Sequence, residues 1–116
     1  FKEKNITYTV EVEKMNLDID RLVPLGLIMN ELVTNAVKHA FKNKTSGKIA
    51  IKGIFENGFY KLMVTDDGEG MPEKFSMDRT NSLGIRLMKG LANQIKAKIS
   101  IQSVSGETCF LIQIPL

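Results

Sequence analysis

The sequence predicts a two-layer α/β sandwich, in which a mixed, mostly antiparallel sheet carries its helices on one face. Two stretches repeat apolar residues at the spacing of a helix, and five shorter ones read as strands. Their order along the chain is strand, helix, strand, strand, loop, helix, strand, strand. A chain of 116 residues that is 43% hydrophobic and 25% charged suits one compact domain, so residues 1–116 are expected to fold as a single unit.

The first strand is expected over residues 6–12. Apolar side chains alternate there with polar or small ones: Ile6, Tyr8, Val10 and Val12. A period of two is typical of a strand that buries one face and exposes the other, so these four side chains are expected to face the core.

A long amphipathic helix is expected to follow, from Asp20 through Phe41. Asp20 is a residue type that opens helices, and Pro24 close behind it is tolerated in a first turn. Apolar residues then recur at helical spacing: Leu25, Ile28, Leu32, Ala36 and Ala40. The polar stretch 43–47 ends the helix.

A hairpin is expected next, because apolar residues at 49–54 and an alternating run at 60–64 flank the turn sequence at 56–58. Its second strand leads to Asp66. Residues 68–81 lack a sustained period and contain Gly, Pro, Ser and Asp, which predicts a long mobile connection, and connections of that length usually have a function.

The last third of the chain predicts a second helix and a closing hairpin. Leu83, Leu87, Leu91 and Ile95 have helical spacing, and Asn81 or Ser82 would cap that helix. Apolar residues at 99–101 and 110–114 then flank a turn at 105–106.

Composition excludes several classes of function. The formal charge of +3 is small and the lysines are scattered, which argues against a nucleic-acid surface. No apolar stretch is long enough to span a bilayer, so direct membrane insertion by this domain is not expected. Cys109 is the single cysteine, which indicates a reducing, cytoplasmic setting. The chain begins with Phe1 rather than Met, which suggests a piece of a longer protein that could be membrane-anchored.

Polar residues on the first helix are the first candidate site. Glu31 and Asn35 are four residues, or about one turn (~5.4 Å), apart on the same side, and Lys38 and His39 continue that side. An amide oxygen such as that of Asn35 suits magnesium, Lys38 and His39 suit phosphate or ribose oxygens, and Glu31 suits a general base. The alternative is an ordinary solvent-facing stripe.

The loop after the second strand of the hairpin is the second candidate. It reads Asp66-Asp67-Gly68-Glu69-Gly70, where the two glycines allow a sharp turn and close approach of a ligand. A carboxylate at the strand end, Asp66, can accept from an exocyclic amine, the group that distinguishes adenine from guanine. The alternative is a polar β-turn, and the spacing does not match a calcium-binding EF-hand.

The start of the second helix is the third candidate. Ser82, Leu83 and Gly84 stand where free N–H groups and the helix dipole would face a phosphate, and Gly84 permits close approach. Arg86 either contacts phosphate or is solvated. A Walker motif and a Rossmann fingerprint are both missing from the sequence, so the common nucleotide-binding folds are not supported.

Together and in order, the three segments resemble the N, G1 and G2 boxes of the superfamily that contains gyrase, the heat-shock chaperone, histidine kinases and the mismatch-repair ATPase. Residues 24–41 (PLGLIMNELVTNAVKHAF) and 82–87 (SLGIRL) resemble the histidine kinases often called HWE-like. The match covers nearly the whole chain. It implies the Bergerat ATP-binding fold of a sensor histidine kinase catalytic domain.

The resemblance also implies roles for individual residues. Asn35 would coordinate Mg²⁺, Asp66 would bind the adenine amino group, and Gly68 and Gly70 would shape the adenine pocket. The ATP lid would begin at Met71 and run to residue 81, and Gly84 would line the phosphates. Thr108 occupies the place of a threonine or serine that often faces the nucleotide in the family's penultimate strand. These implied positions extend the site beyond the three segments.

By this resemblance the domain positions ATP and Mg²⁺ for transfer of the γ-phosphate to a histidine on a separate dimerisation domain, with a response regulator downstream. His39 is the single histidine and lies in the nucleotide-site helix, so the acceptor is not in this chain. Two alternatives stay open. One is an ATPase or conformational switch in which Glu31 activates water. The other is a non-catalytic nucleotide-binding regulatory module. It stays open because the chain has Thr80-Asn81-Ser82 where many kinases have further glycines.

Overall fold

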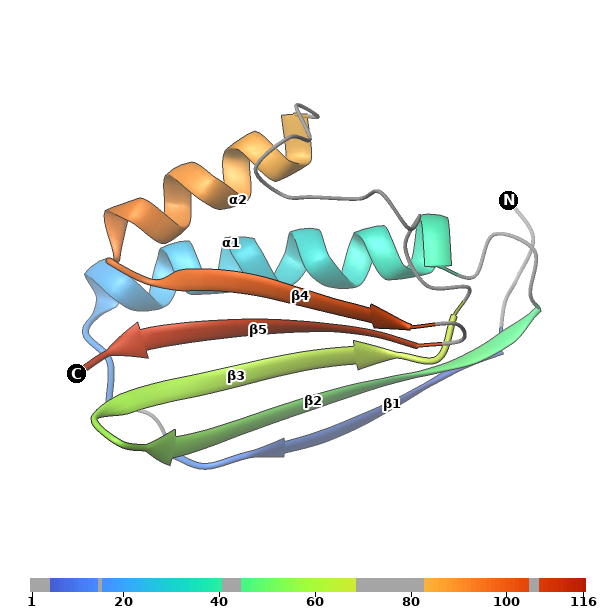
Figure 1. Cartoon of the computed structure of the whole chain (residues 1–116), viewed down its shortest axis with the longest axis horizontal. Helices are drawn as coiled ribbons and strands as arrows, with labels where there is room; N and C mark the ends of the chain where they lie inside the picture. Colours follow the sequence, from blue (N-terminus) through green and yellow to red (C-terminus); the bar gives the residue numbers. More distant parts are fainter. Residues whose placement is uncertain (1–4, 15, 41–44, 69–82, 105–106) are drawn as a thin grey trace.

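The computed structural model describes residues 5–14, 16–40, 45–68, 83–104 and 107–116, with the side chains of 39, 40, 103 and 104 left out. Both helices lie on one face of a five-stranded sheet (Figure 1). The elements in chain order are β1 (Asn5–Val12), α1 (Ile19–Asn35), the π-helical turn η1 (Ala36–Ala40), β2 (Ser46–Glu56), β3 (Phe59–Asp66), α2 (Leu83–Gln94), β4 (Lys98–Val104) and β5 (Glu107–Pro115).

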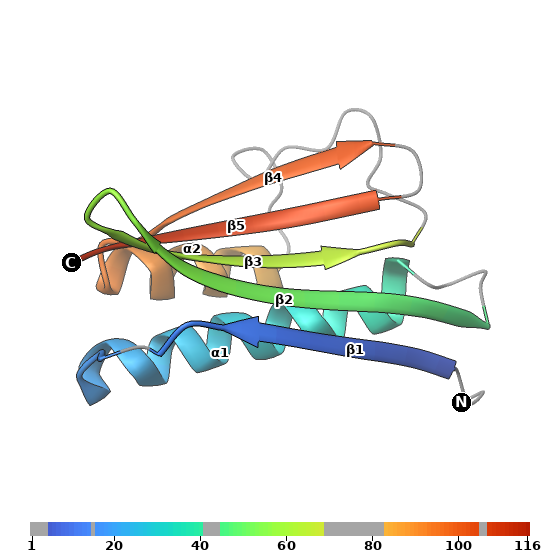
Figure 2. The same cartoon turned by 90° about the horizontal axis from the view of Figure 1, so that it is seen from below.

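The predicted two-layer architecture and element order are confirmed. The strand order is β1-β2-β3-β5-β4, in which β1 and β2 are parallel and the other neighbouring pairs are antiparallel. Seen from below, the sheet lies in front of both helices (Figure 2). The sheet is therefore mixed and mostly antiparallel, as the sequence predicts.

The core lies between the helices and the sheet. Alternate residues of β3 and β5 point into it, and α1 and α2 cover them with Ile28 and Met88, both fully buried. The sheet contributes fully buried side chains opposite them: Ile49, Tyr60, Ile112 and Ile114. Burying each such side chain stabilises the fold by roughly 1.5–3 kcal/mol.

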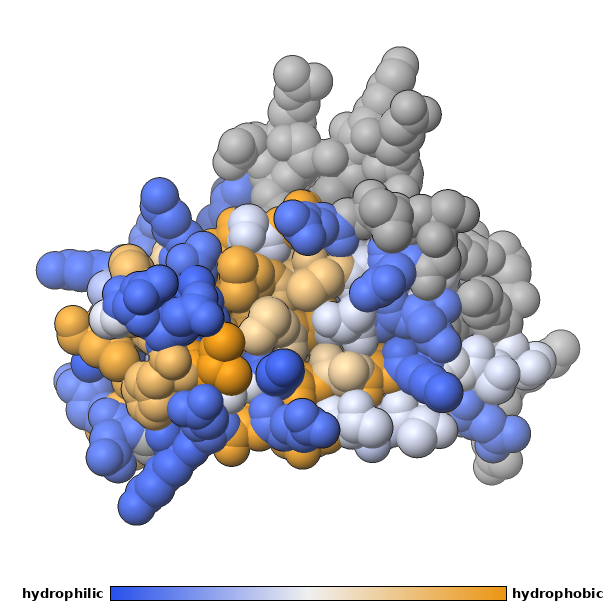
Figure 3. All heavy atoms as spheres, turned by 60° about the horizontal axis from the view of Figure 1, so that its bottom comes forward, coloured by the Kyte–Doolittle hydropathy of each residue, from blue (hydrophilic) through white to orange (hydrophobic). Residues whose placement is uncertain are grey.

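The other face of the sheet is open. Figure 3 shows this side of the molecule, where apolar residues gather among charged ones. Met63 and Leu111 are cross-strand neighbours of β3 and β5 on this face, and both are only half-buried. An antiparallel sheet can leave one face solvated in this way, because its hairpin connections do not require helices on both sides.

Strand β1 lies at one edge of the sheet, and the buried face expected for it is wrong at three of four positions. Its register with β2 puts Tyr8 and Val10 beside Ile49 and Ile51, on the helix side. Yet Tyr8 is 50% exposed, Val10 63% and Val12 39%. The alternation correctly predicted a strand, but an edge strand has neighbours on one flank alone, so its side chains are covered incompletely.

Helix α1 begins earlier than expected. Its N-cap is Asp18, whose Oδ1 accepts a hydrogen bond from the backbone N–H of Arg21 at 3.2 Å, a standard way to satisfy a free N–H of the first turn. The entrance predicted at Asp20 is therefore wrong by two residues, and Pro24 lies in the second turn rather than the first. The guanidinium of Arg21 donates to the carbonyl of Pro115 at 2.7 Å, which ties this end of α1 to the end of β5.

The far end of α1 also differs from the expectation of a regular helix. The α-helix ends at Asn35, where the N–H of Ala36 is shared between the carbonyls of Leu32 and Val33, and the chain continues as the π-helical turn η1. Phe41, the expected last residue, lies outside the described residues. Because a π-helix closes its bonds at i→i+5, η1 is wider than an α-helical turn, and such turns are frequent at functional sites.

The hairpin of β2 and β3 is confirmed, with Asn57 and Gly58 both at positive φ, 53° and 80°. This is the signature of a two-residue type I′ turn, which Asn-Gly favours because neither residue is much strained there. The second helix and the β4–β5 hairpin are also confirmed. The caps proposed at Asn81 and Ser82, and the turn at 105–106, lie outside the described residues.

Candidate functional site

The three predicted segments lie toward the same end of the molecule (Figure 1). The C-terminal half of α1, the end of β3 and the start of α2 lie there together, and β5 begins at the same end. The register of β3 with β5 and the packing of α1 against α2 are the contacts that bring these distant parts of the sequence together.

Asp66 and Thr108 are buried polar residues of the sheet at this end. They are direct partners across the β3–β5 ladder and belong to the buried rows of their strands, Asp66 being 6% exposed and Thr108 2%. Directly opposed residues have Cβ atoms about 4.5–5.5 Å apart, so one ligand group can reach both. The structure thus places Thr108 beside Asp66, although 42 positions separate 66 from 108 in the sequence.

The carboxylate of Asp66 is oriented by its own loop. The backbone N–H of Gly68 donates to Oδ1 of Asp66 at 3.0 Å in a buried setting. A buried carboxylate needs such donors, because an unsatisfied charge in the interior is costly. Gly68 is itself buried, so the turn that follows β3 folds back against the strand end.

Glu31 and Gly84 join the two helices at this end. A Cβ built on Gly84 would lie 3.1 Å from Cδ of Glu31 and closer still to its Oε1. The Glu31 carboxylate therefore packs against the first turn of α2, where the helix dipole favours negative charge. From the sequence, Gly84 is predicted to permit close approach of a phosphate. In the structure, its lack of a side chain also makes room for Glu31.

The remaining residues of the α1 stripe are less uniform than expected. Asn35 is half-buried and lies one α-helical turn beyond Glu31, so these two share a face as predicted. Lys38 is exposed in η1, and of His39 the structure describes the backbone alone. Lys38 lies in the wider turn of η1, so it does not follow Glu31 and Asn35 at regular α-helical spacing.

Some predicted positions lie at the margin or outside the described residues. Gly70, Met71 and Ser82 fall within the undescribed segment 69–82, so their roles stay predictions. Leu83 is the first residue of α2 and is 82% exposed, and its role also stays a prediction.

The described protein side chains offer few donors for a metal ion. Within the part of the chain that the structure describes, no group of three or more His, Cys, Asp or Glu side chains could hold a metal ion. The magnesium role of Asn35 stays a prediction, and it does not require such a group, because magnesium keeps several waters and takes oxygens from nucleotide phosphates. A single amide ligand at a half-buried position is compatible with that mode.

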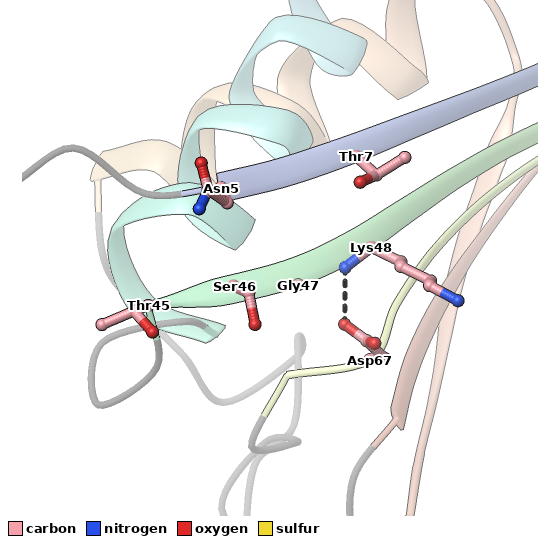
Figure 4. Close-up of a pocket in the computed structure, with 7 residues that line it drawn as sticks. All are labelled: Asn5, Thr7, Thr45, Ser46, Gly47, Lys48 and Asp67. Carbon is pink, nitrogen blue, oxygen red and sulfur yellow. Dashed lines mark hydrogen bonds between the residues drawn. The ribbon is translucent and has the colours of Figure 1, made fainter.

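Sequence reasoning missed one feature of this end. A hollow on the open face of the sheet brings together the starts of β1 and β2 and the residue after β3 (Figure 4). Its lining consists of Asn5, Thr7, Thr45, Ser46, Gly47, Lys48 and Asp67. No motif could have predicted this hollow, since three separate segments build it and the parallel pairing of β1 with β2 aligns them.

Comparison with known proteins identifies the family. Residues 20–116 match the model of the histidine kinase-, DNA gyrase B- and HSP90-like ATPases. The chain belongs to this ATPase family. The match begins within α1 and covers the rest of the chain, so every segment of the candidate site lies inside it.

Curated relatives in this ATPase family include histidine kinases. The chain is 33% identical to the sensor histidine kinase PdtaS of Mycolicibacterium smegmatis over 103 residues, which cover 86% of this chain and 21% of the relative. It is 32% identical to the anti-sigma F factor of Geobacillus kaustophilus over 68 residues, 59% of this chain and 47% of that protein. The chain thus spans less than half of the length of either relative.

A solved structure in the family supports the fold closely. The blue-light-activated histidine kinase EL346 of Erythrobacter litoralis superposes with a TM-score of 0.90 at 27% identity, covering 98% of this chain and 36% of that one. The resemblance to histidine kinases read from the sequence is confirmed by these matches. No helix among the described residues is long and apolar enough to cross a membrane.

Proposed function

We propose that this domain binds ATP with Mg²⁺ and is the catalytic domain of a two-component sensor histidine kinase. It positions the nucleotide so that the γ-phosphate is transferred to a histidine on a separate dimerisation domain, from which a response regulator receives it. The observation that supports the proposal is that, in a member of the ATPase family, the two polar segments assigned to phosphate join at Glu31 and Gly84, while Asp66 and Thr108 are paired and buried in the sheet beneath the helices.

The adenine end of ATP is assigned to Asp66 and Thr108. The buried Asp66 carboxylate accepts a hydrogen bond from the adenine amino group, and the Thr108 hydroxyl lies within reach of the same base or of a water between them. Gly68 holds the carboxylate in place from the opposite side of the turn. Guanine presents a carbonyl where adenine has its amine, so this arrangement selects adenine.

The phosphate end is assigned to α1 and α2. Asn35 contributes an oxygen to Mg²⁺, Lys38 and His39 neutralise or donate to phosphate oxygens, and the first turn of α2 at Gly84 offers backbone N–H groups. Mg²⁺ supplies charge neutralisation for the transferring phosphoryl group. Phosphoryl transfer depends mainly on positioning and electrostatics, so these residues suffice for the nucleotide half of the reaction.

Glu31 is proposed as the catalytic carboxylate. Glu31 lies on the same helix as Asn35, and its carboxylate contacts the first turn of α2, whose backbone is assigned to phosphate. A base there would act on the attacking group, a step typically worth 10²–10⁴-fold in rate, as an order of magnitude.

The binding test uses the isolated domain, a nonhydrolysable ATP analogue, and titrations with and without magnesium. Asp66→Asn is expected to weaken binding roughly tenfold in both conditions, because its one oxygen would accept from the Gly68 N–H and leave the amide nitrogen, which cannot accept, facing adenine. Asn35→Ala is expected to remove chiefly the part of the affinity that depends on magnesium. Absence of saturable binding by the unmodified domain would sink the proposal, and equal loss in both variants would show the division of roles to be wrong.

A second candidate function is a nucleotide-binding regulatory module that acts by docking on a protein partner, and the similarity to an anti-sigma F factor favours it. To separate the two, the helical domain of the parent protein is supplied together with ATP. Acid-labile phosphate on that domain supports the histidine kinase, whereas nucleotide binding without any transfer supports the regulatory module. Steady release of phosphate without the helical domain would instead favour a water-activating ATPase.

The proposed setting of this domain is the cytoplasm, where ATP is available. Cys109 is a free, half-buried thiol, which suits a reducing compartment.

A further inference from the structure

Two successive aspartates stand at the end of β3, Asp66 as its last residue and Asp67 directly after it, and they point to opposite faces of the sheet. Asp66 belongs to the buried helix-side row, whereas Asp67 is exposed and borders the hollow on the open face (Figure 4). The proposed function gives Asp66 the adenine amine and gives Asp67 nothing. Asp67 nevertheless makes two close contacts with β2.

Both contacts are to Lys48. The backbone N–H of Lys48 donates to Oδ1 of Asp67 at 2.7 Å, and the backbone N–H of Asp67 donates to the carbonyl of Lys48 at 3.2 Å. In a regular antiparallel ladder the two residues of such a pair exchange two N–H···O=C bonds. Here the side-chain carboxylate replaces one of the two carbonyls.

This substitution has a geometric consequence for the chain. The ladder of β2 and β3 runs regularly up to the pair of Ile49 and Asp66. Because the carboxylate of Asp67 rather than its own carbonyl holds Lys48, the backbone can leave the strand direction immediately after Asp67. It does so, since the N–H of Gly68 turns back to the carboxylate of Asp66.

We propose that Asp67 is a positioning residue for nucleotide selection: its carboxylate fastens the end of β3 to Lys48 and thereby fixes where the Asp66 carboxylate points. This inference rests on the proposed binding of adenine by Asp66. A charge-assisted hydrogen bond is roughly twice as strong as a neutral one, which suits a bond that helps to hold a turn at the rim of the sheet. Asp67 is exposed, so its removal leaves no cavity in the core.

The test compares Asp67→Ala with Asp67→Asn. An asparagine Oδ1 still accepts from the Lys48 N–H, although without the charge, whereas alanine cannot. Glu11→Ala is the matched control, because Glu11 is another exposed acid on the open face, located on β1 beside Lys52. The unmodified domain and the three variants are titrated with nonhydrolysable analogues of ATP and of GTP, and their melting temperatures are measured.

The expected result is a loss of discrimination. Asp67→Ala should lower the preference for the ATP analogue over the GTP analogue by about tenfold, mostly through weaker ATP binding, since a displaced Asp66 accepts poorly from adenine. Asp67→Asn should keep the preference within about threefold of that of the unmodified domain, and Glu11→Ala should not change it. Hydrogen exchange at the Lys48 amide should become fast in Asp67→Ala and stay slow in Asp67→Asn.

Three outcomes would overturn the inference. If Asp67→Ala keeps full ATP preference while the unmodified domain binds ATP selectively, Asp67 does not position Asp66, although the proposed function survives. If affinity for both analogues falls equally along with the melting temperature, the role of Asp67 is structural alone. If the unmodified domain binds neither analogue, the proposed function fails first and this inference fails with it.

Discussion

The carboxylate of Glu31 on α1 lies directly against the α-carbon of Gly84 on α2, with no space for a side chain between them. This contact joins two of the three segments assigned to the nucleotide. It also explains why residue 84 is a glycine: a side chain there would clash with Glu31, whether or not a phosphate approaches.

Gly84→Ala should destabilise the domain. The added methyl would lie 3.1 Å from Cδ of Glu31, so the flexible end of the Glu31 side chain must move, at a cost of about 1 kcal/mol, the low end for overpacked sites. Urea unfolding measures the change. In the double variant Glu31→Ala/Gly84→Ala the clash is relieved, so the two effects should not add, and strict additivity would contradict the contact.

Glu31→Gln should separate catalysis from packing. Glutamine has nearly the same shape and keeps the contact with Gly84, but it cannot act as a base. The affinity for the ATP analogue and the melting temperature should therefore change little, while phosphoryl transfer to the supplied helical domain should fall by about 10²–10⁴-fold. Transfer at the unmodified rate would remove Glu31 from the chemistry and leave it a packing residue between the helices.

Thr108→Val should weaken nucleotide binding more than it weakens the fold. Thr108 is 2% exposed beside Asp66, so valine fills the same space but lacks the hydroxyl that is assigned to the base or to its bridging water. Loss of one hydrogen bond corresponds to about 0.5–1.5 kcal/mol, or up to about tenfold in affinity for the ATP analogue. Calorimetric titration tests this, and Thr65→Val, on the open face of the same ladder, is the matched control.

Tyr60 should make stability depend on alkaline pH. Its hydroxyl donates to the carbonyl of Glu13 at 2.7 Å, and its ring packs over Gly53. Burial, and secondarily the negative charge of Glu13, raise the pKa of Tyr60 above its usual value of 10.0. The raised pKa means that the folded state retains the proton more strongly than the unfolded chain does.

The sign of that effect follows directly. The stabilisation by Tyr60 is fully present below about pH 10, the unfolded-state pKa, and is lost as the pH rises through the higher folded-state pKa. Tyr60→Phe should cost about 1 kcal/mol at neutral pH through the lost hydrogen bond, and its unfolding free energy should fall less steeply above pH 10 than that of the unmodified domain. Parallel pH curves for the two proteins would contradict the assignment, because the lysines titrate alike in both.

Much of the fold could be predicted because local periods and turn chemistry encode it. The Asn57-Gly58 turn is an example, since its two positive φ angles are a local property of those residues. The start of α1 was less predictable, because Asp18 and Asp20 are both acceptable caps by type, and the bond to the N–H of Arg21 decides between them. The π-helical turn could not be predicted, because the apolar residues keep a regular α-helical spacing through Ala36 and Ala40.

The candidate site was predictable to a similar extent. Glu31 and Asn35 were recognisable as neighbours because an α-helix places i and i+4 on one face. The pairing of Asp66 with Thr108 was not, because the order of strands in a sheet depends on non-local contacts, and β5 rather than β4 lies beside β3. Thr108 entered the prediction through family resemblance alone.

The sequence by itself determined the strands and helices, the type I′ turn and the three polar and glycine-rich segments, because each depends on residues close together in the chain. The tertiary structure alone decided that Glu31 meets Gly84, that Thr108 stands opposite Asp66, and that Asp67 fastens the end of β3 to Lys48. It also left Val10 on the edge strand exposed in spite of its alternating pattern. The physical reason is the same throughout: periodicity tells which side of an element a residue occupies, whereas what covers that side depends on which elements pack beside it.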